Sequence, residues 1–354
     1  MLPKVLFLYV LGILLVDFYL GEGPFSAEGL RYEPEVVPAY TDSLRQSCAR
    51  TLREAGLSEK SVSLSLGLLL GDKSQIGGET KSEIRQAGMS HLLAVSGLHI
   101  GILWMLLNCL CRPLSFFPLP RGVYPRWRLV YRFVNLFLLW VYILMIGTPV
   151  SAVRAGLMLS IVEVSWLAGS DTWSFNNLYS SAILILVFSP TQLYQPGFQL
   201  SFFAAAGILA FQPWLQGQPK VQQLVMVSLS AQAFTFPIVA YWFHQVPVLG
   251  WVQGVLVVPF IAVLVYLLLG LLVCTCLLPF LVPVLTFCVE VCVHWIMTMA
   301  HYISVAETWL MGGRLEWHPN LLEVVLMEAG AIFFVWLLRR TYVQKEAWEK
   351  ISFQ

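Results

Sequence analysis

The sequence predicts an all-α, polytopic membrane protein with about ten transmembrane helices and short re-entrant or amphipathic helices. Hydrophobic residues make up 58% of the 354 residues and charged residues only 12%, against about 45–50% and about 25% in soluble domains. A soluble core cannot bury so much apolar surface, whereas a bilayer can. The formal net charge of +1 gives no overall field that would favour nucleic acid or an acidic partner.

Apolar runs of the length that a membrane helix needs, about 17–25 residues, recur along the chain. The run 178–188 is short. The run 248–277 is long and contains Gly254 and Pro259, which predict a break where the backbone faces protein or water. The candidate spans are residues 4–20, 88–111, 129–147, 150–167, 178–188, 198–214, 224–243, 248–277, 282–303 and 322–338.

Clusters of arginine and lysine predict the orientation, because cytoplasmic loops carry an excess of these residues. The loop after the second span contains Arg121, Arg126 and Arg128, and further basic residues occupy the C-terminal tail. We therefore expect both termini to be cytoplasmic. The expected divisions are a first transmembrane helix at 1–20, an extracytoplasmic segment at 21–87, a main transmembrane domain at 88–338 and a cytoplasmic tail at 339–354.

The extracytoplasmic segment is predicted to contain an amphipathic helix over residues 41–55. Its apolar face carries Leu44, Cys48 and Leu52, and three arginines lie elsewhere on it: Arg45, Arg50 and Arg53. Two interpretations stay open, a helix lying along the membrane surface and a basic collar at an outer mouth. The apolar stretch 61–70 is too short to span easily, and we expect it to dip into the membrane and return near residues 71–73.

The second span carries an unusual set of polar side chains. At about 100° per residue, Ser96 and His99 share a helix face, and His91 lies about 80° from His99. Polar groups in hydrocarbon are costly and usually face a bundle interior or a water-filled cavity. The pattern therefore indicates either a pore lining or a buried polar node that joins helices, and the residues alone do not separate these.

Arg154 lies inside the apolar run 150–167, where a guanidinium requires a carboxylate, a phosphate or water. It is either a phosphate contact or half of an ion pair. The glutamates available to such a pair are Glu163, Glu290, Glu323 and Glu328.

Other polar residues have two interpretations each. Gln199 and Ser201 begin a later span, where they either bond a neighbouring helix or line a mouth. Arg121, Arg126 and Arg128 either hold emerging phosphates or simply follow the positive-inside rule.

Four motifs resemble, in order, those of the ComEC-type competence proteins, membrane channels through which a single strand of DNA enters during natural transformation. HLLAVSGLHIGIL at 91–103 resembles the family signature. LLLGD at 68–72, followed by 83–88, resembles its lead-in. GTPVSAVRAG at 147–156 resembles its "PSxxRA" helix with one extra residue between proline and serine, and PGFQLSF at 196–202 resembles its "FQLSF" segment.

The resemblance implies that residues 88–338 form a competence-type channel domain in a bacterial inner membrane. Its path candidates are His91, Ser96, His99, Arg154, Gln199 and Ser201. It also implies single-stranded DNA as cargo, with an extracytoplasmic DNA receptor and a cytoplasmic ATP-driven translocase as partners. Full-length members carry an OB-like and a metallo-β-lactamase-like domain. We expect neither in this chain, so we expect no nuclease here and consider separate chains that carry those domains as partners.

Two other function classes stay open. Ser96 and His99 are in principle a nucleophile and a base, which would suit an intramembrane hydrolase, although no acid is visibly placed to orient the histidine. The break near Gly254 and Pro259 would suit a small-molecule or ion transporter. Neither a nucleotide-binding motif nor a metal-ligand spacing among the seven cysteines indicates a cofactor.

Overall fold

The computed structural model describes residues 39–72, 74–78, 80–81, 84, 89, 96–111, 124–170, 174–244, 248–311, 319–320, 322–333 and 335. Within these residues every regular element is helical and no β-strand occurs. The predicted first span at 4–20 and the tail at 339–354 lie outside them, so the cytoplasmic placement of both termini stays a prediction.

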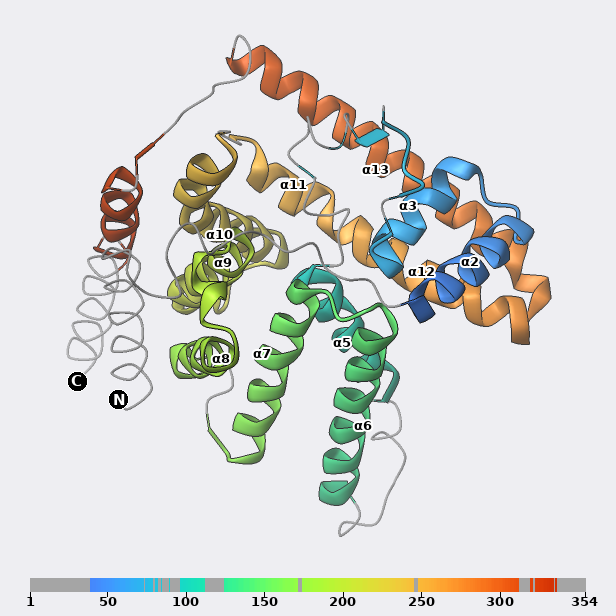
Figure 1. Ribbon diagram of the computed structural model, residues 1–354, viewed down its shortest axis with the longest axis horizontal. Coiled ribbons are helices and arrows are strands. Elements are labelled where there is room, and N and C mark those ends of the chain that lie inside the picture. Colours follow the sequence, from blue (N-terminus) through green and yellow to red (C-terminus); the bar gives the residue numbers. More distant parts are fainter. Residues whose placement is uncertain are drawn as a thin grey trace. The chain divides into compact units, whose positions relative to one another are not determined.

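Figure 1 labels the helices along the chain. In chain order they are α2 (Ala39–Glu54), α3 (Glu59–Leu70), α5 (Gly97–Cys111), α6 (Tyr124–Met145), α7 (Val150–Leu167), α8 (Phe175–Phe188), η3 (Pro190–Tyr194), α9 (Pro196–Leu215), α10 (Lys220–Phe243), α11 (Gly250–Leu256), α12 (Val258–Leu277), η4 (Pro279–Leu281) and α13 (Val282–Met311). Residues 322–333 form a further helix.

Five described stretches have the length and apolar composition to cross a membrane: Val150–Leu167, Pro196–Leu215, Lys220–Phe243, Val258–Leu277 and Pro279–Leu310. Shorter apolar helices occupy Gly97–Leu110, Leu129–Met145 and Phe175–Phe188. Large apolar side chains stay exposed on these helices, as on Phe137 of α6 and Phe287 of α13, which suits contact with lipid. The chain is therefore a helical membrane protein, as the composition predicts.

The predicted long run 248–277 is broken, as its Gly and Pro content indicates. Helix α11 ends at Leu256, Val257 is a turn residue, and α12 begins at Val258 with Pro259 in its first turn. The prediction of a continuous helix over 88–111 is wrong in its first part. Helix α5 begins at Gly97, and Ser96 and Met89 are not helical.

The described residues form two compact units. The first contains those up to Leu193 together with Leu256–Ala306, and the second contains Tyr194–Val255 and those from Glu307 onward. The predicted division of the chain at residues 20, 87 and 338 stays a prediction.

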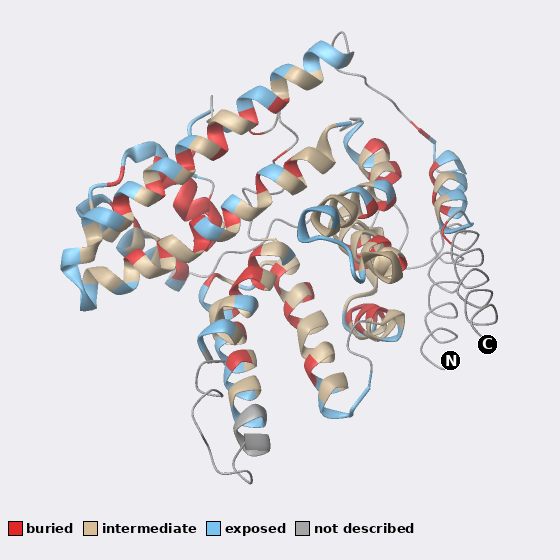
Figure 2. Ribbon diagram, turned by 180° about the vertical axis from the view of Figure 1, so that it is seen from behind, coloured by how far each residue is buried: buried red, intermediate tan, exposed pale blue. Residues whose placement is uncertain are grey.

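Helix α3 is almost wholly buried within the first unit. All ten residues from Ser61 to Leu70 are buried, and Figure 2 shows this helix as a continuous buried segment. Its 12 residues are about 18 Å long, short of the ~30 Å hydrocarbon thickness. The chain leaves it through Gly71, which has a φ of 70°, a left-handed conformation that glycine adopts without the Cβ penalty. Whether α3 enters the membrane stays a prediction.

Both ends of α3 are bonded by side chains of other helices. At its N-terminus the Glu290 carboxylate of α13 accepts hydrogen bonds from Ser58 N–H at 2.7 Å and from Ser61 Oγ at 2.8 Å. At its C-terminus Tyr142 of α6 donates its hydroxyl to the Leu69 carbonyl at 2.6 Å. These bonds supply partners to backbone groups that a helix leaves unsatisfied at its ends. The amphipathic helix α2 packs on α3 and buries Leu52.

In the second unit, α9 and α10 pack closely against each other. A Cβ placed on Gly207 of α9 would lie 2.5 Å from the Ser230 carbonyl oxygen of α10 and 3.0 Å from the Phe234 ring. Only glycine allows the two backbones to approach so closely. Helix α11 approaches α10 in the same manner, with Gly254 beside the Ser228 side chain.

Candidate functional site

Ser96 and His99 form a helix cap at the start of α5. The Ser96 carbonyl accepts hydrogen bonds from His99 N–H at 3.0 Å and Ile100 N–H at 3.3 Å, which makes Ser96 the N-cap residue. The Ser96 N–H donates back to His99 Nδ1 at 3.1 Å, and Ser96 Oγ lies 3.0 Å from the same nitrogen. The bond from Ser96 N–H to His99 is one half of a capping box, with histidine in the place of the usual Glu or Gln, and the Ser96 hydroxyl lies against the ring nitrogen.

The cap fixes the histidine ring. Because the Ser96 N–H is a donor, Nδ1 of His99 acts as an acceptor, and the ring proton of neutral His99 is assigned to Nε2. The ring is buried, with only 2% of His99 exposed. The predicted proximity of Ser96 and His99 is confirmed, but Ser96 precedes the helix and does not belong to its face.

Arg154 lies in the first half of α7 and is 6% exposed. Its Nη1 donates to Oε1 of Gln192 at 3.3 Å. Gln192 is itself buried in the 3-10 turn η3. Gln192 is not among the residues predicted from the sequence. Its signal is an amide in the short segment between Pro190 and Pro196, which connects two apolar runs.

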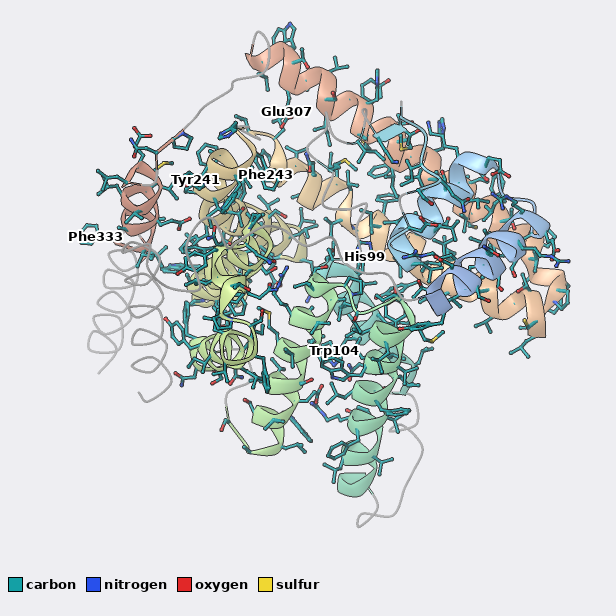
Figure 3. The ribbon with its side chains drawn as sticks, viewed as in Figure 1. His99, Trp104, Tyr241, Phe243, Glu307 and Phe333 are labelled. Atoms are coloured by element: carbon teal, nitrogen blue, oxygen red, sulfur yellow. The ribbon has the colours of Figure 1, made fainter. Side chains whose placement is uncertain are left out.

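The starts of α5 and α7 are in direct contact. A Cβ on Gly97 would lie 3.5 Å from the Ala155 Cβ, so the residue after the cap serine packs against the residue after Arg154. We define the polar site as Ser96, His99, Arg154 and Gln192, which this contact brings to one end of the two helices. Figure 3 labels His99 at this end of α5.

Three of the four glutamates considered as partners of Arg154 have other described bonds. Glu163 pairs with Arg132 of α6 at 2.5 Å, and Glu290 bonds the start of α3. Glu323 exchanges hydrogen bonds with Asn320. Glu328 is buried at 7% exposure, and no described residue bonds its carboxylate oxygens.

Gln199 and Ser201 belong to the second unit. Gln199 Oε1 accepts a hydrogen bond from Trp242 Nε1 of α10 at 2.9 Å, so it joins two helices, one of its two predicted roles. Ser201 donates to the Gly197 carbonyl within α9 at 2.8 Å. Their place along a DNA path stays a prediction.

The three arginines of α2 each have an acidic partner. Arg45 lies 3.4 Å from Asp42, Arg50 lies 2.7 Å from Glu54, and Arg53 lies 2.8 Å from Glu59. The hydrogen bond from Arg53 lowers the pKa of Glu59 below its ordinary value. Local carboxylates thus compensate these charges, and the basic collar stays a prediction.

The side chains of the remaining predicted residues lie outside the described part of the chain. His91 and Arg121 lie outside the described residues, and Arg126 and Arg128 lie in the first turns of α6 with side chains outside them. In the part of the chain that is described, no group of three or more His, Cys, Asp or Glu side chains is arranged to hold a metal ion.

Comparison with known proteins places these residues in a family. The model of the family described as "Competence protein" matches residues 68–341, a stretch that includes the whole polar site. "ComE operon protein 3" of Bacillus subtilis (strain 168) is 31% identical over 229 residues, and an uncharacterized protein of Aquifex aeolicus (strain VF5) is 28% identical over 225 residues. No solved structure matches.

The aligned parts cover 64% and 63% of this chain but only 28% and 50% of those relatives. The chain thus spans half or less of the curated relatives that it matches. Because the family match extends over most of the chain, the chain belongs to the Competence protein family.

Proposed function

We propose that this chain forms the membrane path through which single-stranded DNA enters the cytoplasm during natural transformation. The proposal rests on the Competence protein family and on the similarity to ComE operon protein 3. A polyanion that crosses a bilayer needs a wet path with donors that replace its water. The proposal assigns transport to this chain, and no catalysis.

The observation that carries the proposal is Arg154. It is a buried guanidinium on a helix long and apolar enough to cross a membrane, and an ionisable residue at such a place is by default a functional group. It bonds the neutral amide of Gln192, and the residue after it, Ala155, packs against Gly97, the residue after the cap serine. Guanidinium, amide and imidazole N–H groups are donors that suit phosphate oxygens.

The proposal includes a place and partners. The chain would lie in the inner membrane of a bacterium, with both termini in the cytoplasm. An extracytoplasmic receptor would deliver DNA, and a cytoplasmic ATP-driven translocase would pull it. Separate OB-like or metallo-β-lactamase-like domains are further candidate partners. Reporter fusions to the two ends of the chain test the orientation.

An intramembrane hydrolase is the second candidate, because Ser96 Oγ lies 3.0 Å from His99 Nδ1, a nucleophile–base distance. The helix cap accounts for the same distance, because the Ser96 backbone N–H donates a hydrogen bond to the same nitrogen, Nδ1 of His99. Ser96→Asn separates the two, because asparagine caps a helix about as well as serine but has no hydroxyl. DNA import that survives Ser96→Asn supports the cap, and loss of a hydrolytic activity with import intact favours the enzyme.

A small-molecule or ion transporter is favoured by one observation, the break at Val257 between α11 and α12. Broken helices expose backbone carbonyls that bind ions in many transporters. Solute flux into vesicles that contain the purified chain, measured without DNA, would support this class.

Uptake of labelled DNA by cells tests the proposal. Arg154→Ala and His99→Ala are expected to lower import by at least about a hundredfold, the factor for about 2.8 kcal/mol. Arg154→Lys keeps the charge and should retain part of the import. His294→Ala, an exposed histidine of α13, and Lys60→Ala, an exposed lysine of α3, are the matched controls. Normal import with Arg154→Ala at normal membrane levels would remove Arg154 from the path.

A further inference from the structure

A second polar cluster joins α5, α6 and α7 away from the polar site. The Glu163 carboxylate of α7 binds Arg132 Nη1 of α6 at 2.5 Å and accepts a hydrogen bond from Trp104 Nε1 of α5 at 3.2 Å. The Glu163 side chain is 5% exposed. The Arg132 guanidinium lies 3.7 Å from the ring centroid of Trp166, which adds a cation–π contact. We call these four residues the Glu163 cluster.

Helices α5 and α7 touch at two levels. Gly97 meets Ala155 at the first level, and Trp104 meets Glu163 at the second. These contacts are seven residues apart on α5 and eight apart on α7, or about 10 Å and about 12 Å at 1.5 Å per residue. The helices therefore run in the same direction, and Trp104 lies further along α5 than His99 (Figure 3).

The two contacts differ in strength. The contact of Gly97 with Ala155 is between small apolar groups and gives no directional bond. At the second level, Trp104 donates a hydrogen bond to the charged Glu163 carboxylate. Hydrogen bonds to a charged group are stronger and more directional than neutral ones. The second level therefore sets how α5 is rotated and how far it slides along α7.

Helix α6 is held to the same face of α7. Trp140 donates to Ser160 Oγ at 3.1 Å, and a Cβ on Gly156 would lie 2.7 Å from Ile143 Cδ1. Gly156, Ser160 and Glu163 recur at intervals of four and three residues, so they form one stripe of α7. Arg154 lies nine residues before Glu163, about 2.5 turns and therefore on the opposite side of α7.

We propose that Glu163, through Arg132 and Trp104, positions the start of α5 against α7 and so holds the Ser96–His99 cap beside Arg154. Glu163 and Arg132 are positioning residues that need not touch the cargo. The inference rests on the proposed function for the importance of the polar site, but the arrangement itself is independent of DNA. Loss of either charge lets α5 shift and separates the two halves of the site.

A disulfide measures this arrangement directly. A Cβ placed on Gly97 would lie 3.5 Å from the Ala155 Cβ, and this distance matches the Cβ–Cβ distance of a disulfide, about 3.5–4.5 Å. Gly97→Cys with Ala155→Cys, in a chain whose native cysteines are replaced, should cross-link readily in isolated membranes. Adding Glu163→Gln or Arg132→Gln should lower the cross-linking rate by about tenfold, which corresponds to about 1.4 kcal/mol. Arg132→Lys keeps the charge and should preserve most of the rate.

The matched control is Glu290→Gln, which neutralises another hydrogen-bonded carboxylate of the same unit and should leave the rate unchanged. An unchanged rate with Glu163→Gln would overturn the inference, as would an equal fall with Glu290→Gln, which would indicate general loosening. Failure of the proposed function appears separately, as normal DNA import with Arg154→Ala, and would leave the cross-linking result intact.

Discussion

Helices α5, α6 and α7 of the first unit share a charged cluster in addition to close glycine contacts, whereas the described contacts among α9, α10 and α11 of the second unit are neutral. Among the described residues, α5, α6 and α7 are joined by an ion pair, an indole hydrogen bond and a guanidinium–aromatic contact. Helices α9, α10 and α11 are joined by close approaches of glycine to backbone or serine and by the neutral bond between Gln199 and Trp242. Both arrangements are adequate to pack helices in a membrane.

The two kinds of helix contact differ in their energetic cost. Close packing of small residues needs no charge and carries no desolvation cost. A buried ion pair is weak evidence for stability, because an apolar replacement of similar volume is often as stable. Its presence between α5, α6 and α7, the helices that carry or contact the polar site, therefore favours a role in holding a specific polar geometry.

The largest expected loss of folding stability comes from removing the Glu163 carboxylate of the first unit. Glu163→Ala leaves Arg132 without its carboxylate in a largely buried place, and breaking such a pair costs about 3–5 kcal/mol. Denaturation of the purified protein in detergent micelles checks this cost. Trp104→Phe is the matched control, because it removes one hydrogen bond but keeps the ion pair and should cost about 0.6 kcal/mol. Equal costs for the two variants would erase the distinction between the units.

Overpacking should be the largest effect within the second unit. Gly207→Ala places a methyl group 2.5 Å from the Ser230 carbonyl oxygen, and forcing α9 and α10 apart should cost about 1–3 kcal/mol. The control is Gly270→Ala in α12, where a Cβ would meet no atom within 4 Å. The same denaturation measurement applies. A neutral Gly207→Ala would show that the two helices do not pack as closely as described.

Local features of the molecule could be predicted from the sequence, whereas contacts between distant helices could not. The length of the apolar run predicts α7 at Val150–Leu167, and Gly254 and Pro259 predict the break at Val257, because both follow from local composition. The spacing of Ser96 and His99 predicted their contact, which is local. The partners of Arg154 and Glu163 could not be predicted, since Gln192 and Arg132 are 38 and 31 residues away and only the packing of helices selects them.

A smaller effect tests the neutral bond of the second unit. Trp242→Phe removes the donor to Gln199 and should cost about 0.6 kcal/mol, the average for a side-chain hydrogen bond between membrane helices. Trp309→Phe, at a tryptophan that is 82% exposed, is the control and should be neutral. If Trp242→Phe costs as much as Glu163→Ala, the second unit is also held by a strong polar bond.

The smallest effect concerns acid pH. Because Arg53 lowers the pKa of Glu59, the pair stabilises the fold above the unfolded-state pKa of about 4.3. This contribution is lost as the pH falls through the lower folded-state value. The melting temperature of the wild type should exceed that of Glu59→Gln slightly at neutral pH, and the difference should vanish in acid. A difference that persists in acid would mean that charge is not its cause.

The central claim is that DNA passes the polar site of α5 and α7. A photo-crosslinking amino acid placed at Val153, beside Arg154, tests it most directly in cells that are taking up labelled DNA. A covalent adduct between the chain and DNA is expected at position 153. No adduct is expected with the same group at Phe137, a residue of α6 that is 68% exposed and expected to face lipid. Adducts at Phe137 but not at position 153, while import proceeds, would contradict the account.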